Sequence, residues 1–173
     1  MSAVTGRKGE ASGFSLIELM VTLTVLAFLI LLSAPLTRAW VQSAHQRSAY
    51  GMLLEALGRA KALSLRNAAA QTDQTLPVAA ACLIGSDARV VVPVGTSLSC
   101  AAGIVWSSTL PEDAEVTLAT GGGALSCVAY NERGLALDAT VGGLHCTPAP
   151  NNGQQAIINV IVGNENALTV SIP

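Results

Sequence analysis

An unbroken apolar run near the N-terminus constrains this chain more than any other feature of its sequence. From Phe14 to Ala34 the chain reads FSLIELMVTLTVLAFLILLSA, which is 21 residues with one formal charge, at Glu18. As an α-helix with a rise of about 1.5 Å per residue, this run is about 31 Å long, enough to cross the hydrocarbon core of a membrane. Arg7 and Lys8 lie in the short polar segment before it. These charges predict that the N-terminus stays in the cytoplasm and that the C-terminal bulk crosses the membrane.

Two common membrane-targeting signals explain this segment less well. A cleaved secretory signal usually has an apolar core of about 7–15 residues and a small-x-small cleavage site. Here the run is longer, Leu32-Ser33-Ala34 is a poor site, and Pro35 follows it directly. A plain signal anchor accounts for the length but not for Glu18, because a carboxylate inside a spanning helix costs at least about 2.5 kcal/mol. A functional glutamate is therefore expected, the alternative being a residue at headgroup level with no partner.

The residues around the start of the run resemble a known processing signal. Gly13-Phe14-Ser15-Leu16-Ile17-Glu18, after a short basic leader, is similar to the class III signal of type IV prepilins and type II secretion pseudopilins. The resemblance implies that a prepilin peptidase cleaves between Gly13 and Phe14 and methylates the new amine of Phe14. It also assigns an assembly role to Glu18 and to Pro35, which matches a proline near the end of the apolar half of such helices.

The same resemblance implies where the chain works and with which partners. The protein is expected to sit in the bacterial inner membrane with its N-terminus in the cytoplasm and its head in the periplasm. It then assembles with other pilin or pseudopilin subunits into a filament. The segments implied are a cleaved leader (1–13), a transmembrane and filament-core helix (14–34), an amphipathic helix half (35–70) and a β-rich periplasmic head (71–173).

The chemistry of the signal explains its residue types. Glycine has no Cβ, so an intramembrane protease can approach the backbone at Gly13. Cleavage exposes an ammonium group on Phe14, and methylation keeps its charge. Glu18 lies one helical turn away and can pair with that amine or with a neighbouring subunit's. Since an unpaired charge among apolar helices is costly, the pair is expected to fix the axial register of the subunits.

The helix is expected to continue well beyond the apolar run, from Phe14 to Asn67. Alanine, leucine, glutamine and arginine dominate the second half and favour helix. Apolar residues recur there at helical spacing and predict a stripe that packs under a folded head. Pro35 should loosen or kink the helix, because proline lacks an amide donor and clashes with the preceding turn. The stripe consists of Tyr50, Leu53, Leu54, Leu57 and Ala60.

After Gln71 the sequence changes to short β-rich runs separated by turn residues. These runs predict an α+β protein in which an antiparallel β-sandwich or folded sheet is seated on the helix. The last two runs flank Gly163-Asn164-Glu165-Asn166 and predict a hairpin. The expected strands are Val78–Ile84, Arg89–Val94, Ile104–Ser107, Ala114–Ala119, Leu125–Tyr130, Leu135–Asp138, Ala156–Val162 and Ala167–Ile172.

The four cysteines predict disulfides rather than a zinc site, because the chain has no CxxC motif and only two histidines. Three pairings are open. The sequence-local one, Cys82–Cys100 with Cys127–Cys146, closes two loops of similar size and is preferred. Each bond would contribute about 3 kcal/mol by the loop-entropy estimate. Free buried thiols remain the alternative.

The candidates for catalytic or ligand-binding chemistry are weak, and we expect no enzyme, no cofactor and no bound metal. His45 lies on the helix and His145 in a loop, far apart in sequence, and no serine sits in a GxSxG motif. Gly121-Gly122-Gly123 lacks the lysine and hydroxyl residue of a phosphate-binding loop and predicts a flexible turn. Glu112, Asp113 and Glu115 could hold calcium, but EF-hand spacing is absent and a solvated turn is favoured.

A second, looser resemblance narrows the type of subunit. The segments MLLEALGRAKALSLRN and TLPVAAACL are similar to those of H-type (GspH) pseudopilins and FimT minor pilins. The resemblance implies a low-abundance structural subunit near the tip of a type II secretion pseudopilus, which serves protein export. A minor pilin of a type IV pilus, acting in fimbrial assembly and twitching, is the alternative. The helix and its processing site are common to both machines.

A DNA receptor for natural transformation is the least favoured function. Nucleic acid affinity depends on lysine and arginine contacts to phosphates. Residues 139–173 contain neither, and the chain as a whole carries a formal net charge of −2. Five of the nine basic residues lie on the second helix half: Arg38, Arg47, Arg59, Lys61 and Arg66. A solvated helix face, or pairing with acidic neighbours in a filament, explains them better than phosphate binding.

Overall fold

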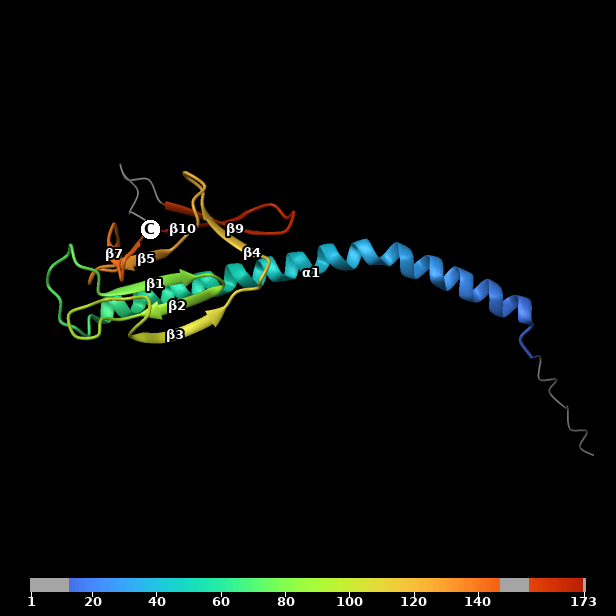
Figure 1. The fold of residues 1–173 in the computed structure, drawn as a ribbon, viewed down its shortest axis with the longest axis horizontal. Helices are drawn as coiled ribbons and strands as arrows, with labels where there is room; N and C mark the ends of the chain where they lie inside the picture. The colour runs from blue at the N-terminus through green and yellow to red at the C-terminus, as the bar shows by residue number, and fades with distance from the viewer. Residues whose placement is uncertain (1–12, 147–155, 173) are drawn as a thin grey trace, which may run out of the picture. The chain divides into compact units, whose positions relative to one another are not determined.

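The computed structural model describes residues 13–146 and 156–172 of the chain. One long helix is followed by short strands, shown in Figure 1. By their internal contacts the residues separate into two units, Met1–Trp40 and Val41–Pro173, each described by itself. The elements are α1 (Leu16–Arg66), β1 (Ala79–Ile84), β2 (Asp87–Val91), β3 (Ile104–Thr109), β4 (Ala114–Leu118), β5 (Cys127–Tyr130), β6 (Ala136–Leu137), β7 (Thr140–Val141), β8 (Leu144–His145), β9 (Ala156–Val162) and β10 (Leu168–Ile172).

Helix α1 begins two residues later and ends one residue earlier than the sequence predicts. At its C-terminal end Asn67 adopts the left-handed conformation, with φ of 42°, and its N–H donates to the carbonyl oxygen of Leu63 at 3.2 Å. Asparagine is one of the few residues that tolerate this conformation, and it ends the helix as a C-cap. The helix continues through Pro35. The bend expected there stays a prediction.

The face of α1 that packs under the head differs in part from the predicted stripe. Leu53 and Leu57 are buried as expected, but Leu54 is 42% exposed, so its assignment to the stripe was wrong. The buried row is made largely of small residues, because alanine lets strands approach the helix closely. A prediction from hydrophobic spacing gives leucine more weight than alanine. It therefore included Leu54 and left out the buried alanines Ala49 and Ala56. The buried residues of this face are Gln46, Ala49, Leu53, Ala56, Leu57, Ala60 and Ser64.

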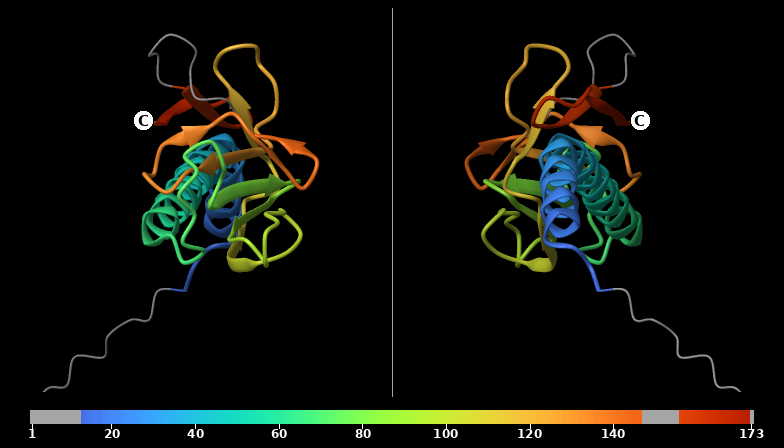
Figure 2. Two further views of the ribbon diagram at one scale, coloured as in Figure 1. Left: turned by 90° about the vertical axis from the view of Figure 1, so that its left-hand side faces the viewer. Right: turned by 90° about the vertical axis from the view of Figure 1, so that its right-hand side faces the viewer.

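The strands form antiparallel sheets, as the sequence predicts, and the α+β class is confirmed. One sheet has the order β3-β2-β1-β5-β6 and another the order β10-β9-β4, while β7 and β8 form a small hairpin. The chain leaves the first sheet after β3, contributes β4 to the second, and returns as β5. In the two end views of Figure 2, the C-terminal part of the helix lies along one side of the strands.

Most strand predictions hold with shifted ends, and one hairpin was missed. The β9–β10 hairpin is confirmed, with Leu168 opposite Val160. The strand expected over Arg89–Val94 instead spans Asp87–Val91, and Pro93, just beyond it, cannot donate to a ladder. His145, expected in a loop, lies in β8. Strands of two residues, as in the β7–β8 hairpin, are too short to show an alternating pattern.

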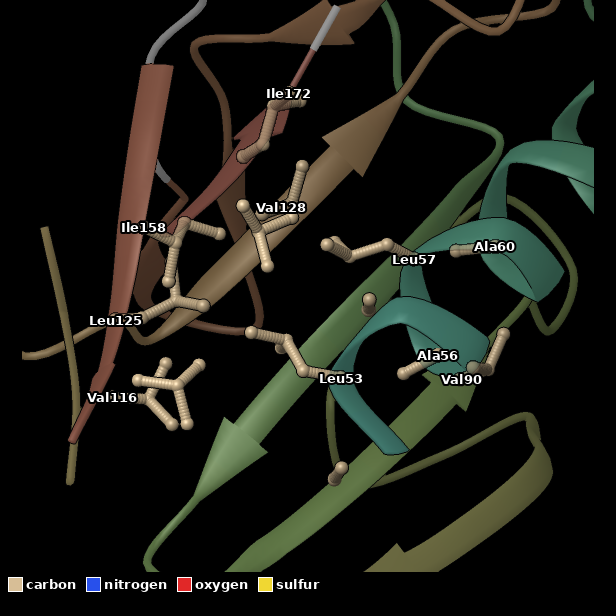
Figure 3. Close-up of a cluster of buried hydrophobic side chains, with 14 of the residues drawn as sticks. Leu53, Ala56, Leu57, Ala60, Val90, Val116, Leu125, Val128, Ile158 and Ile172 are labelled. Atoms are coloured by element: carbon tan, nitrogen blue, oxygen red, sulfur yellow. The ribbon is translucent and has the colours of Figure 1, made fainter. Parts of the chain in front are cut away.

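The main core lies between α1 and the two larger sheets. In Figure 3 the side chains of Leu53 and Leu57 point from the helix toward Val128 and Ile158, which come from different sheets. Tyr130 belongs to the same cluster and is 2% exposed. Burial raises the pKa of its hydroxyl to about 12, so it stays neutral at physiological pH. Strands from both sheets and the helix are thus joined through one apolar cluster.

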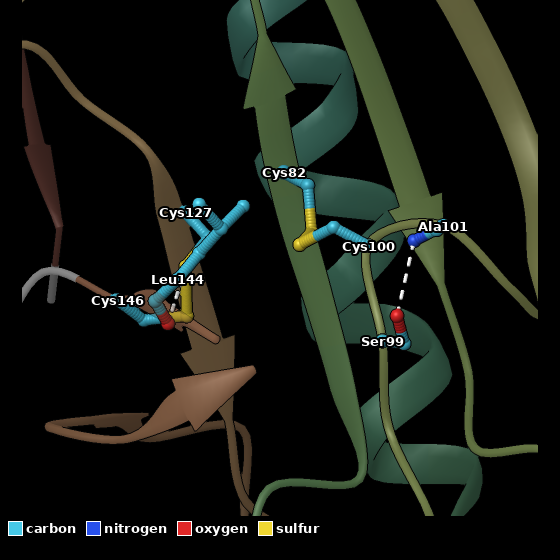
Figure 4. The surroundings of a disulfide bond; sticks show 7 residues. All are labelled: Cys82, Ser99, Cys100, Ala101, Cys127, Leu144 and Cys146. Carbon is cyan, nitrogen blue, oxygen red and sulfur yellow. Dashed lines mark hydrogen bonds between the residues drawn. A yellow bond between two sulfur atoms is a disulfide. The ribbon is translucent and has the colours of Figure 1, made fainter. Parts of the chain in front are cut away.

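The opposite face of the five-stranded sheet carries the disulfides. Residues alternate along β1, so that Ala81 faces the helix while Ala80 and Cys82 face away. Cys82 is bonded to Cys100, and Cys127 to Cys146, the local pairing that the sequence favoured. Figure 4 shows the Cys82–Cys100 bond against β1, with the helix behind the strand, and the Cys127–Cys146 bond beside β5. Cys82 and Cys127 are register partners across β1 and β5, yet each is bonded to a loop. Both faces of this sheet are therefore covered.

A buried glutamine ties the helix to the β9–β10 hairpin. The side chain amide of Gln46 is 5% exposed and donates from Nε2 to the carbonyl oxygens of Val160, at 3.0 Å, and Asn166, at 2.7 Å. These carbonyls lie in β9 and in the loop after it. One side chain therefore satisfies two backbone acceptors of the hairpin.

Replacement of Gln46 by alanine should lower the free energy of unfolding by about 1–3 kcal/mol, because carbonyls left without a donor keep their desolvation penalty. Urea unfolding of the full chain in mild detergent, followed by circular dichroism, measures this difference. Gln74→Ala is the control, since the Gln74 side chain is exposed. Equal unfolding midpoints for the two variants would contradict a structural role for Gln46.

Candidate processing and assembly site

The residues at the predicted cleavage point are accessible in the structure. Phe14 is 81% exposed, and Gly13 precedes the helix in irregular backbone. No described atom lies within 4 Å of a Cβ built on Gly13, and its φ is outside the left-handed region. The fold itself therefore places no demand for glycine at this position. A requirement for glycine must come from what the segment meets outside the chain.

Ser15 begins the helix and holds its first turn in place. Its Oγ accepts the backbone N–H of Glu18 at 3.2 Å, and its carbonyl accepts the N–H of Leu19 at 3.2 Å. Ser15 is thus the N-cap, and Glu18 occupies the third helical position, the spacing of a capping box. A carboxylate there is also favoured by the helix dipole. Our sequence reasoning missed this role of Ser15, although the Ser-x-x-Glu spacing could have shown it.

The hydroxyl groups of the apolar helix are satisfied within the helix. Thr22 donates to the carbonyl of Leu19 at 2.9 Å, and Thr24 donates to that of Val21 at 2.8 Å. Ser33 does the same toward Ile30 at 2.9 Å. Such bonds suit a medium without water, because an unsatisfied polar group there costs several kcal/mol. The carboxylate of Glu18, by contrast, has no side-chain partner in the part of the chain that the structure describes.

The first half of α1 exposes a continuous apolar surface. Large side chains from Leu16, 76% exposed, to Leu32, 67% exposed, lie open all round the helix. An 18-residue window of α1 has a mean hydropathy of 2.5 with none of it buried. By length and composition this helix could cross a membrane. Water is a poor solvent for such a surface, which lipid tails or the helices of other subunits would cover.

The remaining predicted site residues lie further along the chain. The side chain of Pro35 lies outside the described residues, so its assembly role stays a prediction. His45 Nδ1 lies 3.2 Å from Asp113 Oδ1, and both side chains are nearly half exposed. Glu112 and Glu115 are exposed beside Asp113, and within residues 13–146 and 156–172 no three potential ligands gather as a metal site. Residues 121–123 follow β4, and the φ angles of Gly121 and Gly122, 88° and 65°, require glycine.

The comparison with protein families falls on the N-terminal segment. Residues 10–34 match the family model described as the prokaryotic N-terminal methylation motif. The match contains Gly13, Phe14 and Glu18, so it covers both the predicted cleavage point and the unpartnered carboxylate. No curated protein and no solved structure matches the chain.

The motif and the fold together define the class of protein. The motif indicates a type IV pilin-like protein, and a long N-terminal helix that packs against antiparallel sheets is a pilin-like arrangement. A motif of this kind implies processing by a prepilin peptidase and assembly with other pilins. With the exposed apolar helix, it also suggests anchoring in a membrane.

Proposed function

We propose that this chain is a structural minor subunit that assembles through α1 into the tip of a type II secretion pseudopilus. The position of Glu18 is the observation that supports assembly into a filament, and the resemblance of the second helix half and first strand is what favours the secretion machine. Glu18 lies in the first turn of α1, at the start of the exposed apolar half, close to Phe14 and without a side-chain partner in the described chain. The helix cap and dipole favour an acidic residue at this position, but a full charge in an apolar medium also needs a counter-charge, which a bundle of such helix ends provides.

The proposed path from membrane to filament uses only residues of this segment. The precursor is held in the inner membrane by the apolar half of α1, with the head in the periplasm. Prepilin peptidase hydrolyses the bond between Gly13 and Phe14 and methylates the freed amine, which stays cationic. When the helix enters the filament, Glu18 pairs with the amine of Phe14 or with that of a neighbouring subunit. Axial displacement of the helix would leave both charges unpaired in an apolar medium.

The head is proposed to act as a rigid docking module rather than as an enzyme. Each histidine faces a single carboxylate at the surface, His45 toward Asp113 and His145 toward Asp138 at 3.6 Å. These are exposed contacts, and exposed ion pairs contribute little. Two disulfides and a shared core instead favour a module that keeps its shape while it is transferred between membrane and filament.

The assignment to an H-type pseudopilin or FimT-like subunit rests on the second helix half and the first strand. Helix α1 ends at Arg66, and β1 contains the Ala-Cys-Leu step on which the resemblance depends. A type IV pilus subunit would use the same helix and the same processing site. The sequence disfavours a DNA receptor, because lysine and arginine are absent from 139–173.

Deletion of the gene, with separate assays of protein export, twitching and DNA uptake, tests the proposal. We expect loss of exoprotein release with twitching and DNA uptake retained, and recovery when the wild-type gene is restored. Loss of twitching with normal export would assign the subunit to a pilus. Loss of DNA uptake alone would overturn the structural proposal in favour of a receptor.

A further inference from the structure

A groove runs between the C-terminal turns of α1 and the edge of the five-stranded sheet. Its cavity has a volume of about 250 Å³. The helix supplies two arginines and two apolar residues, while strand β3 supplies an indole and a valine. The lining residues are Arg59, Ala62, Leu63, Arg66, Val105 and Trp106.

Of the two arginines in the groove, Arg59 is paired with a carboxylate and Arg66 is not. The guanidinium of Arg59 lies 5.4 Å from the centroid of the Trp106 ring. Glu55 Oε1 accepts hydrogen bonds from Nε and Nη2 of Arg59, at 2.9 and 2.7 Å. These contacts hold the guanidinium over the indole, where a cation is attracted to the ring face. Arg66 makes no ion pair within the described residues, so its charge is available to a ligand.

The strand that forms the other wall has a free edge. β3 is the outermost strand of its sheet and pairs with β2 only. Its pairing with β2 is regular from Trp106 to Thr109; beyond that stretch β3 has a bulge at Val105, because Val90 pairs with Trp106 and Val91 with Ile104. Edge strands are commonly protected by charged residues, proline or bulges. β3 reads IVWSST and has no charge or proline, and its bulge lies near one end, so the stretch from Trp106 to Thr109 has an open edge. Val105 is 52% exposed beside the groove.

We propose that this groove binds an extended acidic segment of a partner protein. The segment adds a strand to the free edge of β3 through main-chain hydrogen bonds, as in β-augmentation. Its carboxylates face Arg66, and its apolar side chains rest on Val105, next to the Arg59–Trp106 contact. The inference concerns the head alone and stands whether the subunit serves a secretion machine or a pilus.

A peptide fits this groove better than a nucleic acid does. Only two cationic residues line it, and the chain as a whole has a net charge of −2, so the counterion release that drives nucleic acid binding is small. The free edge of β3 offers backbone N–H and C=O groups, which another peptide backbone complements along its length. The base-stacking surface on Trp106 is already covered by Arg59.

The test uses the processed chain, which begins at Phe14, in detergent. It carries Trp40→Phe, so that Trp106 is its only tryptophan and reports binding by its fluorescence. The probe is a synthetic heptapeptide that alternates glutamate with valine. We expect saturable binding that Arg66→Gln weakens about fivefold, as for a partly exposed ion pair. The matched control is Arg47→Gln, because Arg47 is exposed on α1 and outside the groove.

Three further probes separate the alternatives. A peptide N-methylated on alternate amides cannot pair with the strand edge and should bind at least about tenfold more weakly. Equal binding of this peptide, or of a lysine-for-glutamate peptide, would overturn the proposal. Oligothymidine that competes for the same site would overturn it in favour of a nucleic acid. If the acidic peptide caused no saturable change in Trp106 fluorescence, the proposal would also be overturned. The predictions of leader cleavage and filament assembly would be unaffected by that result.

Discussion

Substitution of Gly13 by valine should leave the leader attached to the protein. A β-branched side chain next to the scissile bond obstructs the approach of the peptidase to the backbone, which glycine leaves open. The folded chain tolerates the change, since no described atom lies within 4 Å of a Cβ at Gly13. Intact mass spectrometry of protein purified from membranes should therefore show the precursor alone, while wild type shows the chain that begins at Phe14.

A glycine within α1 provides the control. Gly51 is exposed, and a Cβ built on it also meets nothing within 4 Å, so Gly51→Ala should be processed like wild type. A fully shortened product from Gly13→Val would contradict the assignment of the cleavage point. The same variant should keep its two disulfides in non-reducing peptide mapping, which shows that the head has folded.

The helix and most strands could be predicted from the sequence because their signals are local. The apolar run beginning at Phe14 and the turn around Gly163 need no knowledge of distant residues. The packing face of the helix could not be predicted in the same way. Ala49 and Ala60 are fully buried while Leu54 is 42% exposed, and only the approach of the sheet decides between them.

In the candidate sites, too, residues close together in sequence could be predicted, and contacts between distant residues could not. The resemblance of one short contiguous stretch to a prepilin processing signal placed Gly13, Phe14 and Glu18 in one site. The cap by Ser15 was also local and was overlooked. The groove at Arg59 and Trp106 could not be predicted, because its walls are 47 residues apart in sequence and meet only through the order of the sheet.

Replacement of Glu18 by alanine should leave cleavage intact but exclude the subunit from filaments. Without the carboxylate, the charged amine of Phe14 enters an apolar helix bundle unpaired, and breaking a buried pair in this way costs about 3–5 kcal/mol. That cost corresponds to at least about a hundredfold disadvantage in competition with wild type. Co-expression of the two forms, followed by quantitative mass spectrometry of sheared filaments, measures the ratio. Glu115→Ala, which removes an exposed acid of the head, should incorporate normally.

Glutamine at this position separates the two physical roles of Glu18. In the Ser-x-x-Glu capping arrangement glutamine serves as well as glutamate, so Glu18→Gln keeps the first turn of the helix while it removes the charge. If pairing with the Phe14 amine drives assembly, Glu18→Gln should be excluded as strongly as Glu18→Ala. Normal incorporation of Glu18→Gln alongside exclusion of Glu18→Ala would show that the side chain acts through the helix cap, and the charge-pairing account would then be wrong.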